Sequence, residues 1–137
     1  MNDVSEFQLR NRLTELTRAG ERLQEFCAQE QLGQEVAHAF DLTLAEWLTN
    51  IISHGFDDAS ERWIEVRLKS ADRFVEMEIE DDGRPFNPLT HPPVDTAAPL
   101  ENRAIGGLGI HMIRRLMDRV EYRREENRNV VTFAKRR

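Results

Sequence analysis

The spacing of apolar residues along this chain predicts five strands and three helices. Strands are expected where apolar and polar side chains alternate, at residues 4–10, 63–69, 73–81, 119–124 and 129–134. Helices are expected where apolar residues recur every three or four positions, at residues 13–29, 34–54 and 108–117. Gly33 separates the first two helices, and Gly55 follows the second as a natural C-cap.

The second and third predicted strands alternate most clearly, and residues 71–72 between them fit a tight hairpin turn. Each strand has one apolar side and one charged side, which indicates a sheet covered on one face only. The apolar side carries Ile64, Val66 and Leu68, then Val75, Met77 and Ile79. The fold class is therefore α+β: a two-layer α/β sandwich with a mixed, mostly antiparallel sheet and helices on one face.

Composition narrows the classes of function. A length of 137 residues predicts a single domain over residues 1–137. The net charge of −6 argues against direct nucleic-acid binding, which relies on a basic field. No apolar run approaches the ~20 residues that span a bilayer, and the first ten residues do not resemble a signal peptide. We therefore expect no membrane association. The single cysteine, Cys27, fits a reducing cytoplasmic setting.

A long irregular segment, about residues 87–107, contains four of the five prolines and leads into the third helix. Segments of this kind are usually lids or disordered stretches. Gly106, Gly107 and Gly109 stand where that helix begins. Glycine permits close approach of a ligand, and the unpaired N–H groups of a first helical turn suit phosphate. The alternative is an ordinary flexible loop, and no Walker sequence follows.

The second helix carries Glu46, Asn50 and His54 at four-residue intervals. At 3.6 residues per turn these side chains lie within an arc of about 80°, which makes one polar stripe. A solvated helix face is the simple interpretation of such a stripe. The alternative is chemical, because a carboxylate can act as a general base and an asparagine oxygen can bind Mg²⁺.

Asp81 continues the inward series of the third predicted strand, so strand periodicity places its carboxylate on the core side. An inward carboxylate needs hydrogen-bond partners. It can cap the following turn at Gly83, or it can accept a bond from an exocyclic amine such as that of adenine. Phe86 can pack beneath a base or fill the core.

Taken together, these three groups of residues resemble the motifs of bacterial anti-sigma-factor serine/threonine kinases, within the superfamily of gyrase, Hsp90, histidine kinase and MutL ATPases. The groups are Glu46–Asn50–His54, Asp81-Asp82-Gly83 and Gly106-Gly107-Leu108-Gly109. The resemblance extends over nearly the whole chain, and it implies a Bergerat-type ATP-binding fold. One departure is Pro85, which stands where the wider superfamily often has a second glycine after the aspartate.

The resemblance implies roles for individual residues. Glu46 would activate the substrate hydroxyl, and Asn50 would coordinate Mg²⁺. Asp81 would bind the adenine amino group, with Gly83 beside it and Thr132 approaching from a late strand. The remaining contacts to ATP would come from His54, Phe86, Gly106, Gly107, Leu108 and Gly109.

The implied function is transfer of the ATP γ-phosphoryl group to a small anti-anti-sigma protein, the antagonist. The chain would bind a sigma factor or release it according to the state of that antagonist, and the resemblance implies a homodimer. Two alternatives remain open at this point. One is a non-catalytic, ATP-gated binding module that does not need Glu46, and the other is a scaffold that binds no nucleotide.

Overall fold

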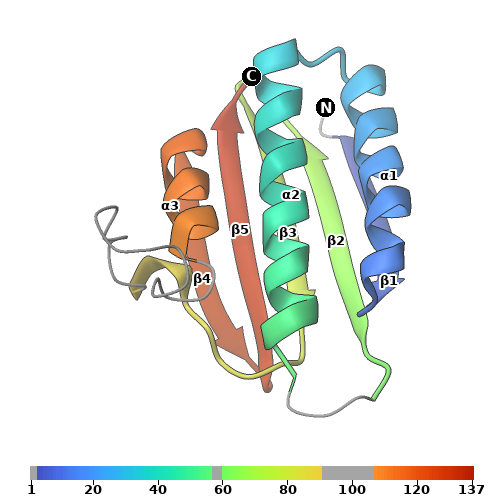
Figure 1. Ribbon diagram of the computed structural model, residues 1–137. Helices are drawn as coiled ribbons and strands as arrows, with labels where there is room; N and C mark the ends of the chain where they lie inside the picture. The colour runs from blue at the N-terminus through green and yellow to red at the C-terminus, as the bar shows by residue number, and fades with distance from the viewer. Residues whose placement is uncertain (1–2, 57–59, 91–106) are drawn as a thin grey trace.

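The computed structural model describes residues 3–56, 60–90 and 107–137, and its elements follow the predicted order (Figure 1). The strands are β1 (Asp3–Arg10), β2 (Trp63–Ser70), β3 (Phe74–Asp81), β4 (Arg119–Glu125) and β5 (Arg128–Arg136). The α-helices are α1 (Leu16–Gln29), α2 (Gln34–His54) and α3 (Gly107–Leu116). Two short 3₁₀ segments, η1 (Leu13–Glu15) and η2 (Pro88–Thr90), precede α1 and follow β3.

The strands form one five-stranded sheet in the order β1-β2-β3-β5-β4. The sequence predicts a mixed, mostly antiparallel sheet, whereas all four pairings in the described part of the chain are antiparallel. The reason is the position of β5. The crossover through α3 makes β4 run in the same direction as β3, but β5 lies between them and runs opposite to both.

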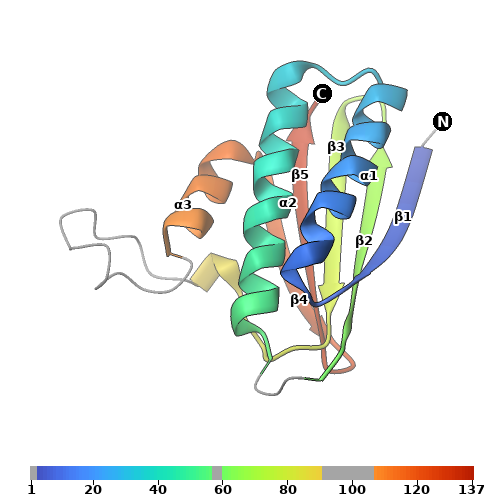
Figure 2. The same cartoon turned by 45° about the vertical axis from the view of Figure 1, so that its right-hand side comes forward.

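The α-helices lie together on one face of the sheet, which gives the predicted two-layer sandwich (Figures 1 and 2). The core fills the space between the layers with fully buried apolar side chains. From α2 these include Phe40, Leu44 and Leu48, and from the strands Ile64, Val66, Leu68, Met77, Ile79 and Phe133. Such burial stabilises a fold by roughly 25 cal/mol per Å² of apolar surface.

The boundaries of the elements follow local chemistry. Helix α2 occupies the predicted range, between Gly33 as its N-cap and Gly55 as its C-cap. The β4–β5 hairpin turns at Glu126 and Asn127, whose φ angles of 49° and 65° match the left-handed turns that suit twisted hairpins. Among the described helices, none combines the length and the hydropathy that a bilayer span requires.

Candidate functional site

A cavity of about 220 Å³ opens between the end of α2, the end of β3 and the start of β5. Figure 1 shows that α2 and β3 finish at the same end of the sheet. The lining combines apolar and polar side chains from segments far apart in the sequence. The residues that line it are Trp47, Asn50, Ile51, His54, Gly55, Asp81, Arg84, Phe86 and Asn129.

Asp81 lies in the wall of the cavity and is only 3% exposed. Its Oδ1 accepts hydrogen bonds from the backbone N–H of Gly83 (2.8 Å) and from Asn129 Nδ2 (3.2 Å). Burial raises the pKa of the Asp81 carboxyl, and these two donors oppose the shift without cancelling it. The carboxylate therefore caps the turn at Gly83, as one of the two interpretations predicts, and it also faces the cavity.

Gly83 follows β3 in the chain and lies against the end of α2. A Cβ at this position would stand 2.5 Å from the carbonyl oxygen of Gly55 and 2.9 Å from Asp81 Oδ1. The next residue, Arg84, donates its backbone N–H to that same carbonyl of Gly55 (2.9 Å). Only glycine allows this close approach, so the turn holds Asp81 against the helix end.

The side chains of the polar stripe of α2 lie against two different parts of the protein, the cavity and α3. Asn50 and His54 line the cavity. The amide nitrogen of Asn50 and the indole nitrogen of Trp47 are buried, and neither has a hydrogen-bond partner within the described residues. Buried polar atoms without partners are rare in folded proteins, and they are expected where a ligand supplies the missing partner.

Glu46 is outside the cavity lining and contacts α3 instead. A Cβ added to Gly109 would overlap the Glu46 carboxylate, with the Glu46 Cδ 3.1 Å away. The helix begins at Gly107, so Gly107, Leu108 and Gly109 form its first turn, where backbone N–H groups have no helical partners. Gly106 and most of the predicted lid, residues 91–106, lie outside the described residues.

Thr132 does not reach the cavity, which corrects the expectation that it approaches the adenine site. It pairs with Glu78 in the β3–β5 register, on the face of the sheet opposite to the helices. Val131 and Phe133, its neighbours on β5, are the residues that point into the core. Strand alternation therefore places Thr132 on the open face.

Asn129 takes the position beside Asp81 that the family resemblance implies for Thr132, since β5 pairs Asn129 directly with Asp81. The same signal that marks Asp81 was available for Asn129. Asn129, Val131 and Phe133 alternate on one side of a strand, and a polar residue in such a series is inward-facing. Trp47, Ile51, Gly55 and Arg84 complete the lining without having been predicted as site residues.

A sequence model of the histidine kinase-like ATPase domain matches residues 9–135. The chain belongs to the histidine kinase-like ATPase family. This ATPase domain is 32% identical over 97 residues to the serine/threonine-protein kinase BtrW of Bordetella bronchiseptica, a match that covers 69% of the chain and 68% of BtrW. The predicted resemblance to bacterial serine/threonine kinases of this superfamily is therefore confirmed.

One further relative agrees with this assignment, and a solved structure agrees with the fold. The ATPase domain is 30% identical over 88 residues to the serine-protein kinase RsbW of Halalkalibacterium halodurans, covering 61% of the chain and 53% of RsbW. The matched region thus spans about half the length of that relative. A solved structure of the RsbU and RsbW domains of Rv1364c from Mycobacterium tuberculosis superimposes with a TM-score of 0.67 at 13% identity. It covers 98% of this chain and 32% of that one, and it supports the fold.

Proposed function

We propose that this protein is an ATP-dependent serine/threonine protein kinase and anti-sigma factor, which phosphorylates a small antagonist protein in a cytoplasmic partner-switching module. The observation that carries the proposal is the cavity in which the buried carboxylate of Asp81 faces Asn50 and His54 of α2. The names of BtrW and RsbW, both protein kinases, support the class of reaction.

The cavity suits an adenine base. Its walls include the ring of Trp47, which lies 5.9 Å from the ring of Phe86 and 5.7 Å from that of Phe133. Ligand sites typically combine such apolar walls with a few fixed polar groups. Within the described residues no hydrogen bond reaches Asp81 Oδ2, which therefore can accept the exocyclic amine of adenine.

Asn50 suits a magnesium ion held by a nucleotide. Its side-chain amide is buried at the cavity, with a nitrogen that lacks a partner, so rotation of the amide would present the oxygen instead. Amide oxygens are ligands for Mg²⁺, which usually keeps several waters and also binds the phosphates of its substrate. A bound Mg²⁺ would neutralise charge on the phosphates, while Asn50 would fix its position.

The phosphates would lie toward the first turn of α3, whose N–H groups have no helical partners and whose positive dipole end favours anions. Glu46 contacts this turn at Gly109, so its carboxylate is near the proposed phosphate position. In our proposal Glu46 accepts or orients the proton of the substrate hydroxyl, a role worth about 10²–10⁴-fold in rate.

Phosphorylation would add nearly two negative charges to the antagonist. Such a change breaks a complementary protein contact, so the antagonist would leave and the kinase would then bind its sigma factor. We propose that the kinase acts as a homodimer.

A second candidate is an ATP-gated binding module without catalysis. The observation that favours it is the position of Glu46, which contacts α3 and is not among the residues that line the cavity. In that case ATP would set the affinity for partners, and Glu46 would be dispensable while Asp81 and Gly109 remained essential.

The test is phosphoryl transfer from γ-labelled ATP, with Mg²⁺, to an antagonist domain encoded in a neighbouring reading frame. We expect transfer by the wild type and its loss in Glu46→Gln. Glu35→Gln is the matched control, because Glu35 is an exposed residue in the first turn of the same helix, far from the cavity. No transfer by the wild type, or equal transfer by Glu46→Gln, would contradict the kinase proposal.

A further inference from the structure

The buried amide of Asn129, in the wall of the cavity, is the centre of a hydrogen-bond network. The residue is only 4% exposed. Its Oδ1 accepts bonds from the hydroxyl of Tyr122 (2.6 Å), from Arg124 Nη1 (3.1 Å) and from the backbone N–H of Phe86 (3.4 Å). Two of these donors come from β4, so the β4–β5 hairpin itself holds the amide in place.

The nitrogen side of the same amide faces acceptors. Asn129 Nδ2 donates to the carbonyl oxygen of Arg84 (2.8 Å) and to Asp81 Oδ1 (3.2 Å), with the carbonyl oxygen of Gly83 at 3.5 Å. Guanidinium and backbone N–H groups only donate, whereas carbonyls and carboxylates only accept. The surroundings therefore allow a single orientation of the Asn129 amide.

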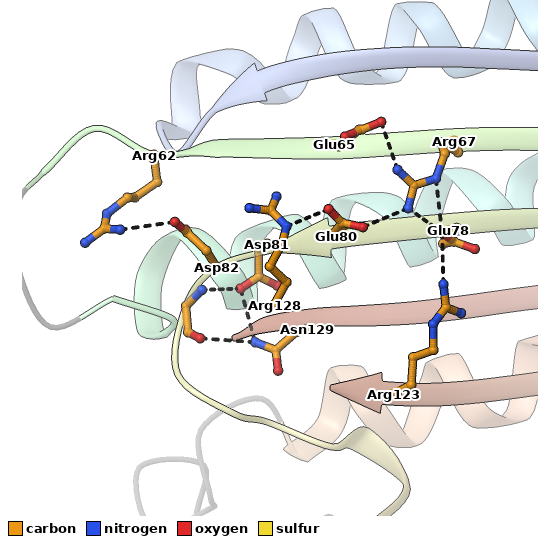
Figure 3. A network of polar contacts seen from close by, with 11 residues as sticks. Arg62, Glu65, Arg67, Glu78, Glu80, Asp81, Asp82, Arg123, Arg128 and Asn129 are labelled. Carbon is orange, nitrogen blue, oxygen red and sulfur yellow. Dashed lines mark hydrogen bonds and ion pairs between the residues drawn. The ribbon is translucent and has the colours of Figure 1, made fainter. Parts of the chain in front are cut away.

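This orientation determines which oxygen of Asp81 a ligand meets. Oδ1 already accepts the bonds from Gly83 and Asn129, and Figure 3 shows Asp81 and Asn129 joined across the ends of β3 and β5. The carboxylate cannot rotate without breaking both bonds. A ligand in the cavity therefore meets one acceptor, Oδ2, in a fixed position.

One fixed acceptor suits adenine better than guanine. Adenine presents an exocyclic amine beside an acceptor nitrogen, whereas guanine presents two neighbouring donors, N1–H and N2–H, beside a carbonyl oxygen. Two parallel donors match both oxygens of a free carboxylate, as in bidentate pairs. When one oxygen is already engaged, guanine leaves a donor unpaired in a buried site, and such a donor is costly.

We propose that Asn129, held by Tyr122 and Arg124, is the positioning residue that makes the Asp81 site selective for adenine over guanine nucleotides. The inference rests on the proposed function, because it takes Asp81 as the residue that binds the base. Arg124 makes a second hydrogen bond at the site, since its Nη1 also donates to the carbonyl oxygen of Gly83 (2.8 Å). It thereby fixes the turn that supplies the other donor to Asp81.

The experiment compares the dissociation constants of ATP and GTP by calorimetry, with Mg²⁺ and the full chain. In Asn129→Ala the Asp81 carboxylate keeps only the bond from Gly83 and loses one of its two restraints, so we expect ATP to bind more weakly and GTP more tightly. The ratio of the two affinities should fall by about tenfold, the effect of one buried hydrogen bond. An unchanged ratio in a variant that still binds ATP contradicts the inference.

Arg124→Gln and Arg123→Gln form a matched pair. Both remove one positive charge from adjacent residues of β4, but Arg123 pairs with Glu125 (2.6 Å) and lies near Glu78 on the open face. We expect the ATP-to-GTP ratio to fall in Arg124→Gln and to stay at the wild-type value in Arg123→Gln. Equal effects of the two substitutions would mean that charge alone, and not the network, sets the preference.

Tyr122→Phe keeps the inference testable if Asn129→Ala does not fold, because it removes a single hydroxyl donor. We expect about a threefold fall in the ratio, since the Asn129 amide keeps its other donors. A wild type that binds no ATP contradicts the proposed function. A wild type that binds ATP, together with a Tyr122→Phe ratio that does not change, contradicts the positioning role alone.

Discussion

Glu80 and Asp81 are neighbours on β3, yet they belong to opposite faces of the sheet and to two different polar networks (Figure 3). Glu80 is on the open face, where it pairs with Arg128 (2.6 Å) and Arg67 (3.0 Å). Asp81 is on the helix-covered face, at the cavity, where its partners are the uncharged donors of Gly83 and Asn129. A step of one residue thus separates two carboxylates with different partners.

The pKa values of the two carboxyl groups shift in opposite directions. Burial raises the pKa of Glu80, but the hydrogen bonds and charges of Arg67 and Arg128 outweigh it and lower the pKa overall. Burial also raises the pKa of Asp81, and its uncharged donors leave the pKa above its ordinary value. On the open face Glu80 is therefore paired with arginines. At the cavity, Oδ2 of Asp81 can still accept a hydrogen bond from a ligand. The first arrangement serves the fold, and the second fits a ligand.

Asp81→Asn should have the largest effect on the cavity. An amide that keeps the bond from Gly83 through its oxygen would present an NH₂ group to the amine of adenine, so two donors would face each other. We expect the affinity for ATP to fall by about 100-fold, because a buried polar mismatch is strongly rejected. The measurement is the ATP-induced rise in melting temperature, and wild-type behaviour of the variant would remove Asp81 from the site.

Gly109→Ala tests the contact between α3 and Glu46 on the same face. The added Cβ would displace the Glu46 carboxylate, a flexible group, so the fold should persist. We expect phosphoryl transfer to fall by about 100-fold, within the range of a misplaced general base. Single-turnover transfer with labelled ATP gives the rate, and circular dichroism gives the fold. A variant that folds and transfers at the wild-type rate would show that this contact has no role in catalysis.

The opposite pKa shifts predict opposite dependences of stability on pH. The pKa of Asp81 is raised above 3.8 in the folded state. Between 3.8 and the raised pKa the folded protein therefore binds more protons than the unfolded chain, and it loses stability as pH rises through this range. Because the pKa of Glu80 is lowered from 4.5, its contribution is present above 4.5 and is lost as pH falls through the lowered value.

Urea unfolding of the wild type, Asp81→Asn and Glu80→Gln across this pH range measures both dependences. The free energy of unfolding of Asp81→Asn, relative to that of the wild type, should increase as pH rises. The free energy of unfolding of Glu80→Gln, relative to that of the wild type, should increase as pH falls. If the two relative free energies of unfolding changed with pH in the same direction, the contrast between the two faces would be wrong.

Glu80→Gln should have the smallest effect. Its partners are partly exposed, so solvent screens the ion pairs, and we expect the free energy of unfolding to change by no more than about 1 kcal/mol. The affinity for ATP should remain at the wild-type value, because Glu80 points away from the cavity. Calorimetry with ATP checks this, and weakened binding would indicate that the open face communicates with the site.

Local periodicity explains how much of the fold the sequence predicts. Strand alternation and the glycines at both ends of α2 are local signals, so the strands, the bounds of α2 and the inward direction of Asp81 could be derived from the sequence. Alternation with Val131 and Phe133 also contradicts the position inferred for Thr132 from the family resemblance. In that case the local signal was the better guide.

The remaining features depend on contacts between distant segments. The pairing of Asn129 with Asp81 follows from β5 being inserted between β3 and β4, an arrangement that no local pattern specifies. The contact of Glu46 with Gly109 depends on how α3 packs against α2. The sequence therefore indicates which residues are chemically capable, and the tertiary structure determines which of them meet.

The most direct test of nucleotide binding at the cavity is a ¹H–¹⁵N correlation experiment on the protein as ATP and Mg²⁺ are added. We expect the perturbed amides to cluster at the cavity, at Asn50, Asp81, Gly83 and Asn129, and those of Glu78 and Arg123 on the open face to keep their positions. Perturbations confined to the open face, or none at saturating ATP, would contradict the claim that this cavity binds the nucleotide.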